Sequence, residues 1–449
     1  MRIDLPVAVV GAGFSGTLLA VNLLRLGQRV VLIERDRERV AKGQAFGTRR
    51  PEHLLNVRAA NMSAYPDDPD HFLRWMGFST TDQANRFVPR LTYGQYLLEQ
   101  LLDALAKAPK LGSVRAGDVA RAAPGGASVM LRMADGEQLE CRTAVLALGN
   151  FPPSPIPGLE GLPSSSVVDN PWDPQALAGA ADLCDIVLIG TGLTAIDVAL
   201  SLKMNGFEGR ISAISRRGLK PRAHAEEGPA VGPVSIPQSR GAHLLADIRR
   251  RADEIGWRGA IDELRPHTQQ LWRAHSTAEQ ARFLRHARSY WDVHRHRLSP
   301  AAASQIAELE QAGRLEFIAG RIAGAEIEHD RARLLLRRRG TTAIEPLQAD
   351  RIINCTGPRG DLSRSEEGLL SDLFKAGQIR SDPHHVGLDI DRLGRLLDRS
   401  GQPSDRLFAV GPITKGEAWE MIAVPDIRRQ VWDLARYLAD AHWVGGEGL

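Results

Sequence analysis

The apolar and polar positions at the start of the chain change their period abruptly. Residues 6–10, PVAVV, form a continuous apolar run of the length expected for a buried parallel strand. The apolar residues at 18–24 then follow helical spacing, and a second apolar run at 29–33 predicts another strand. The pattern therefore predicts a strand, a turn, a helix and a second strand in this order.

The turn of this unit, GAGFSG at 11–16, has the G-x-G-x-x-G pattern, and an acid follows the second strand. In such units the first glycine allows a tight turn, the second lets the backbone approach a pyrophosphate, and the third packs helix on strand. The helix N-terminus faces the phosphates, and the acid accepts the ribose hydroxyls. The unit predicts a dinucleotide site with the binding residues Gly11, Gly13, Phe14, Ser15, Gly16, Glu34 and Arg35.

A membrane span or a signal peptide is the alternative interpretation of residues 5–24. The segment is almost free of charge and about as long as a bilayer-crossing helix. Three glycines within six residues, together with the change of period, favour a turn between a strand and a helix.

A second unit begins near residue 185. The stretch 185–197, DIVLIGTGLTAID, repeats two of the three glycines, with Ala195 in the third place, and a helix at 194–202 and a strand at 211–215 follow. Two such units in one chain commonly bind FAD first and NAD(P)H second. The predicted binding residues of the second unit are Gly190, Gly192, Leu193, Thr194, Ser215, Arg216 and Arg217.

The ends of the two matching strands differ in charge. The first unit has Glu34 there, whereas the second has Ser215, Arg216 and Arg217. An acid at this place favours the free 2′-hydroxyl of NAD, and an arginine accommodates the 2′-phosphate of NADP. The prediction is therefore NADPH, and a basic surface turn is the alternative.

The composition narrows the classes of protein. A chain of 449 residues, 43% hydrophobic, is too long for one core and indicates two or three domains. A net charge of +3 gives no reason to expect nucleic acid. Cys141, Cys184 and Cys355 are far apart, which disfavours a disulfide framework, a zinc site and a dithiol redox centre and indicates a reduced, cytoplasmic protein.

Three further segments resemble parts of flavoproteins with two dinucleotide units. Residues 143–158 and 351–358 resemble the ATG-type crossings between the domains. Residues 407–430 resemble the closing flavin segment, with a strand that ends at Gly411 and a helix that starts near Pro425. The amides at the start of that helix would point at the flavin. The resemblance adds Gly149, Gly357, Gly411 and Val424 to the cofactor-binding residues.

Residues 54–69, LLNVRAANMSAYPDDP, resemble the TN-x-P-x-x-x-M-x-F-x-D-x-P segment of flavin-containing monooxygenases. The resemblance implies that Asn56 and Met62 contact the flavin and that Asn56 is a catalytic residue near C4a; an ordinary loop hydrogen bond is the alternative for Asn56. The monooxygenase fingerprint F-x-G-x-x-x-H-x-x-x-W falls on 162–172, where Trp172 is kept and Val168 stands in place of the histidine.

The chain is more similar to the bacterial FAD-NAD(P)-binding family, which is related to class B flavin-containing and N-hydroxylating monooxygenases. The segments HLLNV, GTGLTAID, SRRGLKPRAH, YWDVHRHR and INCTGP carry this resemblance, which covers nearly the whole chain. It implies an α/β fold with two Rossmann-like domains. An NADPH domain at 181–344, with a helical insert at about 237–312, would be inserted in an FAD domain made of 1–158 and 345–449.

The insert interleaves basic and aromatic residues at 285–297, RHARSYWDVHRHR. We expect Tyr290, Trp291 and Val293 to pack a helix against the NADPH domain; contact with substrate or NADPH is the alternative. The adjacent aromatics and nearby acids do not form the basic stacking face that nucleic acid requires. His294 and His296, two residues apart, would not share a helix face, and no metal site is predicted.

These features predict an NADPH-dependent FAD oxidoreductase that oxygenates a nitrogen or sulfur of a small molecule with O2, by way of a C4a-hydroperoxyflavin. The segment around Asn56 favours this activity. An NADPH-dependent reductase or dehydrogenase without oxygenation is the alternative, favoured by the absent histidine. A flavin-bearing redox sensor is the third hypothesis. Neither nucleic acid nor a membrane is an expected partner.

Overall fold

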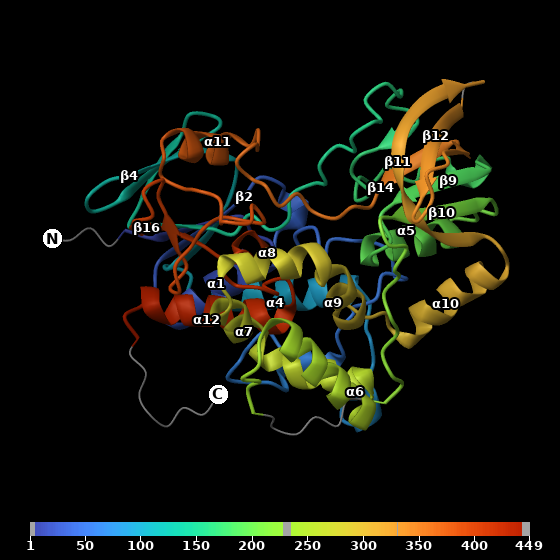
Figure 1. Ribbon diagram of the computed structural model, residues 1–449. Helices are drawn as coiled ribbons and strands as arrows, with labels where there is room; N and C mark the ends of the chain where they lie inside the picture. The colour runs from blue at the N-terminus through green and yellow to red at the C-terminus, as the bar shows by residue number, and fades with distance from the viewer. Residues whose placement is uncertain (1–4, 228–234, 330, 442–449) are drawn as a thin grey trace.

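The computed structural model describes residues 5–227, 235–329 and 331–441. Two lobes, each built around a mainly parallel sheet, lie side by side, and a group of helices lies below and between them (Figure 1).

The first lobe contains a six-stranded sheet in the order β15-β16-β7-β1-β2-β3. All of its pairs are parallel except that of β15 with β16. The central strand β1 is buried along its whole length, which explains its continuous apolar run. The strands are β1 (Val7–Val10), β2 (Val30–Glu34), β3 (Gly112–Ala116), β7 (Thr143–Leu146), β15 (Arg395–Leu397) and β16 (Pro403–Ala409).

Helices cover one face of this sheet, and a smaller sheet covers the other. The first cover consists of α1 (Phe14–Arg25), α4 (Arg90–Lys107) and α12 (Val424–Leu438). The inward positions of α12, three to four residues apart, are all buried, as the helical spacing requires: Ile427, Val431, Leu434 and Leu438. The second cover consists of α11 (Gly368–Lys375) and an antiparallel sheet of β4 (Val119–Pro124), β5 (Val129–Met133) and β6 (Gln138–Cys141).

The second lobe contains a seven-stranded sheet in the order β13-β12-β11-β10-β9-β14-β8. The strands from β8 to β11 in this order are parallel, and β12 and β13 extend the sheet in antiparallel fashion. The strands are β8 (Val167–Val168), β9 (Asp185–Ile189), β10 (Arg210–Ser215), β11 (Leu315–Glu328), β12 (Arg331–Arg338), β13 (Glu345–Ala349) and β14 (Arg351–Asn354).

Three strands correct the predicted domain boundaries. β8 precedes residue 181, and β13 and β14 follow residue 344, yet all three belong to the second sheet. β14 pairs in parallel with β9, Ile352 opposite Val187, in the same way as β7 pairs with β1 in the first sheet. The second unit therefore spans 167–354, because pairing between strands sets this boundary and the local composition does not reveal it.

The helical insert is shorter than predicted. It comprises α6 (Gly241–Leu264), α7 (Thr268–Ala274), α8 (Thr277–His286) and α9 (Arg288–Arg295), with a kink in α6 at Gly256, whose φ is 79°. α10 (Pro300–Gln311) lies within the predicted insert but packs Ile306 and Leu309 into the core beside α5 (Leu193–Met204). α10 is therefore a covering helix of the second lobe.

The remaining elements are short. They are α2 (His71–Trp75), α3 (Thr81–Ala84) and the 3-10 helices Arg37–Arg39, Ala59–Asn61, Ala180–Asp182, Arg265–His267 and Pro412–Thr414. The apolar segment 5–24 forms β1, a turn and most of α1. None of the helices in the described ranges has both the length and the hydropathy of a bilayer-crossing segment.

Candidate cofactor-binding site

The first glycine turn lies between β1 and α1, and at Gly11 and Gly16 it is packed so tightly that no side chain fits. Gly11 has a φ of 99°, and a Cβ on it would lie 2.5 Å from the carbonyl oxygen of Ala147. A Cβ on Gly16 would lie 1.9 Å from the carbonyl oxygen of Gly11. Gly13 caps α1 without a side-chain hydrogen bond, and the first turn of α1 has no acid. The first amides of α1 are thus available to an anion.

The acid predicted to hold the ribose reaches this turn. Glu34 Oε2 accepts a hydrogen bond from the backbone N–H of Ala12 at 2.8 Å, and Glu34 Oε1 accepts one from Asp36 at 3.2 Å. Arg35 extends away from the turn, toward Glu367 at 2.8 Å. The two predicted cofactor-binding residues therefore lie apart: Glu34 contacts the glycine turn, and Arg35 forms an ion pair at the N-terminus of α11.

The C-terminal segment returns to the same turn. Gly411 has a φ of 79°, and a Cβ on it would lie 2.3 Å from Ser15 Oγ. The backbone N–H of Gly411 donates to Gln430 Oε1 at 2.7 Å, which ties the end of β16 to α12. Val424 is the first residue of α12, and Pro425 follows it. The predicted closing segment and the start of α1 therefore meet.

The other predicted residues of the first lobe occupy different surroundings. Phe14 and Met62 are buried in the core under α1 and α4. Gly149, with a φ of 69°, follows β7. Asn56 is half-buried between the lobes and lines a cavity of about 20 Å³ together with Leu193. Its backbone carbonyl accepts a hydrogen bond from His224 Nε2 at 3.1 Å.

The second glycine turn repeats the geometry of the first. Gly190 has a φ of 122°, and a Cβ on it would lie 2.2 Å from the carbonyl oxygen of Cys355, just as Gly11 abuts Ala147. Gly192 caps α5 without a side-chain hydrogen bond, and no atom lies within 4 Å of where its Cβ would be. Leu193 and Thr194 begin α5, and Gly357, with a φ of 88°, follows β14 as Gly149 follows β7.

Ser215 shapes the end of β10. Its Oγ accepts hydrogen bonds from Thr191 Oγ1 at 2.9 Å and from the backbone N–H of Gly218 at 3.0 Å. Gly218 has a φ of 61°, and a Cβ on it would lie 2.7 Å from the backbone nitrogen of Ala319. A tight turn therefore follows β10, and it places Arg216 and Arg217 at the carboxyl edge of the second sheet.

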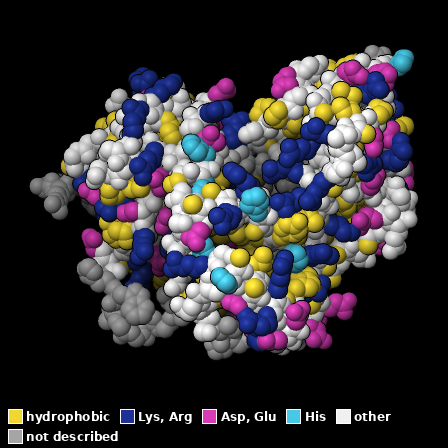
Figure 2. All heavy atoms as spheres, viewed as in Figure 1, with side chains coloured by type: hydrophobic (Ala, Val, Ile, Leu, Met, Phe, Trp, Pro, Cys, Tyr) yellow, Lys and Arg dark blue, Asp and Glu magenta, His cyan; other side chains and the backbone are white. Residues whose placement is uncertain are grey.

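This edge borders a hollow between the two lobes. Figure 2 shows Lys and Arg side chains gathered along the hollow on the side of the second sheet. Arg216 is exposed and Arg217 is half-buried. The guanidinium of Arg217 lies over the ring of Tyr290 in α9, 4.8 Å from its centroid.

The insert packs against the closing segment as well as the second lobe. Tyr290 contacts the second lobe through Arg217, as predicted, whereas Trp291 contacts the first lobe, which corrects the prediction for that residue. Trp291 Nε1 donates to Glu420 Oε1 at 2.8 Å, so this side chain contacts the first lobe. Trp272 Nε1 donates to the carbonyl of Gly416 at 2.8 Å, and its ring stacks on Trp419 with 4.7 Å between the centroids. These contacts link residues more than a hundred positions apart, which no local pattern encodes.

Glu420 is held in an unusual backbone conformation. Its φ is 67°, a region that is costly for residues other than glycine, and its side chain is buried. Arg295 Nε lies 3.1 Å from the carboxylate, and His296 Nε2 lies 3.5 Å from it. Burial raises the pKa of Glu420, but His296 and Arg295, together with the hydrogen bond from Trp291, outweigh it and lower the pKa to about 2.

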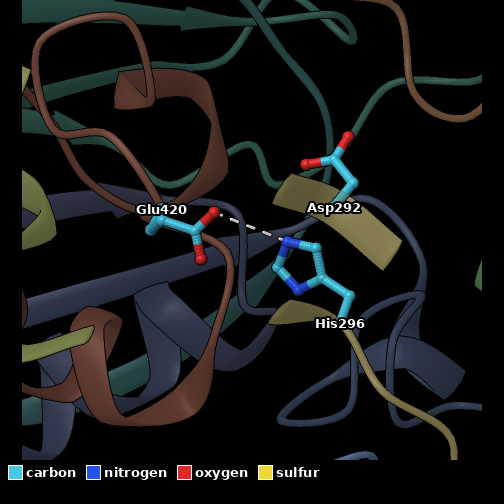
Figure 3. A group of neighbouring side chains, drawn as sticks. All are labelled: Asp292, His296 and Glu420. Carbon is cyan, nitrogen blue, oxygen red and sulfur yellow. Dashed lines mark ion pairs between the residues drawn. The ribbon is translucent and has the colours of Figure 1, made fainter. Parts of the chain in front are cut away.

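Asp292, His296 and Glu420 bring three possible metal ligands together (Figure 3). Asp292 and His296 come from α9 and its C-terminal end, and they face Glu420 on the closing segment. Arginine side chains already neutralise the carboxylates, since Arg288 lies 3.4 Å from Asp292 and Arg295 lies beside Glu420. We interpret the group as an ion-pair cluster that joins the insert to the first lobe.

Two features near the closing segment have no signal in the sequence. Burial and the neighbouring Arg288 lower the pKa of Lys415 to about 8, although Asp382 and Asp292 oppose the shift. A cavity of about 580 Å³ lies between α12, the rest of the closing segment, the insert and the 390–394 loop, and none of the predicted cofactor residues lines it. The cavity depends on how α12, the insert and the 390–394 loop pack together, whereas the pKa of Lys415 depends on its burial and on the approach of Arg288, Asp382 and Asp292.

Comparison with known families agrees with this geometry. Residues 8–151 match the family described as FAD-NAD(P)-binding, so the chain carries an FAD-NAD(P)-binding domain. The predicted fold and the predicted cofactor classes are thereby confirmed.

Solved structures of similar fold cover nearly the whole chain. The reduced ornithine hydroxylase from Pseudomonas aeruginosa is 17% identical, with a TM-score of 0.65 over 98% of this chain and 100% of that one. The cadaverine monooxygenase from Erwinia amylovora, bound to FAD, is 14% identical, with a TM-score of 0.66 over 97% and 94%. The thioredoxin reductase from Lactococcus lactis is 14% identical, with a TM-score of 0.55 over 97% and 98%. At these identities the likeness is one of fold.

Among curated proteins, the tryptophan 2-monooxygenase of Pseudomonas savastanoi is 33% identical over 78 residues. This match spans 17% of the present chain and only 14% of that protein's length.

Proposed function

We propose that the protein is an NADPH-dependent FAD oxidoreductase that oxygenates a nitrogen or sulfur atom of a small molecule, with O2 as co-substrate. The observation that carries the proposal is the pair of equivalent strand–turn–helix–strand units. The second strand of the first unit ends in Glu34, and the second strand of the other unit is followed by Arg216 and Arg217. The full-length similarity in fold to an ornithine hydroxylase and a cadaverine monooxygenase supports amines as the first substrates to test.

The first turn suits FAD. The uncapped amides of α1 would bind the pyrophosphate, and Gly13 would let the backbone approach it. The Glu34 carboxylate, which accepts a hydrogen bond from the backbone N–H of Ala12, would accept one from a ribose hydroxyl in its place or in addition. The amides at the start of α12 would face the flavin, because the closing segment packs closely against the start of α1 where Gly411 approaches Ser15.

The second turn suits NADPH. The amides of α5 are likewise uncapped, and the space beside Gly192 is open. Arg216 and Arg217 supply planar donors for a 2′-phosphate. The second turn would hold NADPH, which would supply the hydride, and the first turn would hold FAD, which would supply the redox chemistry with O2.

The remaining residues position the closing segment and the flavin. The insert contacts the closing segment through the buried Trp272 and through Trp291, which donates to Glu420, and these contacts hold the segment in place. We assign Asn56 a position beside the flavin, as a polar group that favours oxygen transfer over release of hydrogen peroxide. Asn56→Ala is then expected to bind FAD normally but to release more hydrogen peroxide per NADPH, and unchanged coupling would contradict this role.

A reductase without oxygenation is the second candidate. Val168, in β8, stands where flavin-containing monooxygenases have a histidine, and this favours the reductase. A reductase of the dithiol type is disfavoured, because Cys141, Cys184 and Cys355 are separate free thiols and two of them are buried.

Oxygen consumption distinguishes the two candidates. The FAD-loaded protein would be given NADPH in aerated buffer, and ornithine, lysine, cadaverine and a thioether would be added in turn. A monooxygenase consumes NADPH and O2 faster with its substrate and converts the substrate to a product 16 mass units heavier, as expected for one added oxygen atom, roughly one per NADPH. Turnover with an artificial electron acceptor but no heavier product from any substrate would support the reductase.

A further inference from the structure

Three arginines gather at the carboxyl edge of the second sheet, although they come from two distant segments. Ser215, the last residue of β10, lies opposite Ala319 of β11, and the backbone N–H of Arg339 donates to the carbonyl of Ala319 at 2.8 Å. The residue after β12 is thus placed across β11 from the turn that carries Arg216 and Arg217. The topology of the sheet, and not sequence proximity, brings Arg339 to this edge.

Tyr290 of α9 lies against this group. The Arg217 guanidinium covers the face of its ring at 4.8 Å, and Arg217 also reaches the backbone carbonyl of Arg285 at 3.4 Å. Hydrogen bonding to Arg217, and to a lesser degree to Arg339, lowers the pKa of the exposed Tyr290 hydroxyl. Tyr290 therefore holds Arg217 in place, and Arg339 lies near enough to influence the same hydroxyl.

The charge of this group is not balanced by acids. Neighbouring cations are paired, Arg338 with Glu345 at 2.9 Å and Lys220 with Glu310. Arg216, Arg217 and Arg339, in contrast, form no ion pair with a carboxylate within the described ranges 5–227, 235–329 and 331–441. Three guanidinium groups without an acid attract an anion, and their planar donors match phosphate.

We propose that Arg339 and Tyr290 complete the site for the 2′-phosphate of the nicotinamide cofactor. Arg339 contributes a further guanidinium to the phosphate, and Tyr290 is the platform that positions Arg217. The inference rests on the proposed NADPH dependence and adds specificity residues that lie outside the dinucleotide motif. It also gives the insert a part in cofactor selection, because α9 carries Tyr290.

Calorimetric titration with 2′,5′-ADP and with 5′-AMP tests the inference without any need for turnover. Arg339→Ala is expected to weaken binding of 2′,5′-ADP about tenfold, as for the loss of one charged hydrogen bond. Tyr290→Ala should weaken it about two- to fivefold, as for the loss of an exposed cation–π contact, and Tyr290→Phe should keep most of the affinity. Binding of 5′-AMP should change little in any variant.

Arg338→Ala is the matched control, because Arg338 precedes Arg339 but is paired with Glu345 and Glu316. If Arg339→Ala and Tyr290→Ala bind 2′,5′-ADP as tightly as Arg338→Ala does, the inference is wrong although NADPH dependence stands. If the unaltered protein itself binds 2′,5′-ADP no better than 5′-AMP, the NADPH dependence fails, and the inference fails with it.

Discussion

The carboxylate of Glu34 accepts a hydrogen bond from the backbone of Ala12, the residue between the first two glycines, at 2.8 Å. The second unit repeats this relationship with different chemistry, since Ser215 accepts from the side chain of Thr191 at 2.9 Å. The end of the second strand thus reaches the glycine turn in both units. Glu34 in the first unit matches the FAD that we assign to it. Ser215, followed by Arg216 and Arg217, matches the NADPH that we assign to the second unit.

Glu34→Ala is predicted to weaken FAD binding by about tenfold to a hundredfold, as for the loss of one hydrogen bond to a charged group. Titration of the apoprotein with FAD, followed by flavin fluorescence, measures this. Glu38→Ala is the control, because Glu38 is a nearby acid in an exposed pair with Arg49. Equal affinities of the two variants would remove Glu34 from the site.

Replacing Arg216 and Arg217 by alanine is predicted to raise the KM for NADPH by about tenfold to a hundredfold and to change the KM for NADH little. Anaerobic flavin reduction by each nucleotide gives both values. Arg210→Ala, at the start of β10 where Arg210 pairs with Asp185, should leave the preference intact. Equal losses with both nucleotides would mean that the arginines only support the fold.

Glu420→Gln is predicted to destabilise the protein by about 3 kcal/mol, because it breaks a buried ion pair and leaves Arg295 without its partner. Glu417→Gln, which breaks the more exposed pair with Arg273, should cost less than ~1 kcal/mol. Urea denaturation compares the two variants. A similar loss in both would show that the contact between α9 and the closing segment contributes little.

His224 is predicted to make the protein sensitive to mild acid. Burial, with Arg297 nearby, lowers the pKa of His224 to about 4, so the unfolded chain binds a proton before the folded protein does. The stabilising contribution, about 3 kcal/mol, is complete above pH ~6.5 and is lost as the pH falls through about 4.

His224→Gln keeps a hydrogen-bond donor for the Asn56 carbonyl but does not titrate. Its free energy of unfolding should therefore fall less than that of the unaltered protein between pH 6.5 and pH 4. Substitution of the exposed His286 on α8 by Gln serves as the control. Parallel stability curves for all three proteins would exclude His224 as the titrating group.

The glycine turns were predictable from sequence because steric contacts within each turn restrict the residue types that fit there. No residue with a Cβ fits at Gly11 or Gly190, where a carbonyl oxygen lies within 2.5 Å of the Cβ position. The apolar face of α12 was predictable for a similar reason, since helical spacing places Ile427 and Val431 on one side. Features that depend on local geometry can therefore be predicted from the sequence.

The contacts of the insert could not be predicted from the local sequence. Trp272 and Gly416 are 144 positions apart, and nothing in the pattern around either one specifies the other. The position of Arg339 likewise depends on the antiparallel extension of the second sheet. The antiparallel sheet at 119–141 has only a weak sequence signal, because β5 alternates buried and exposed residues but its exposed Met130 is apolar.

The source of the oxygen atom in the product tests the central claim most directly. The FAD-loaded protein, NADPH and the substrate that accelerates NADPH oxidation would react under ¹⁸O2 in ordinary water, and the product would be analysed by mass spectrometry. We predict that the product carries one ¹⁸O atom on nitrogen or sulfur. NADPH oxidation that yields only labelled hydrogen peroxide, or a product without the label, would contradict the assignment as a monooxygenase.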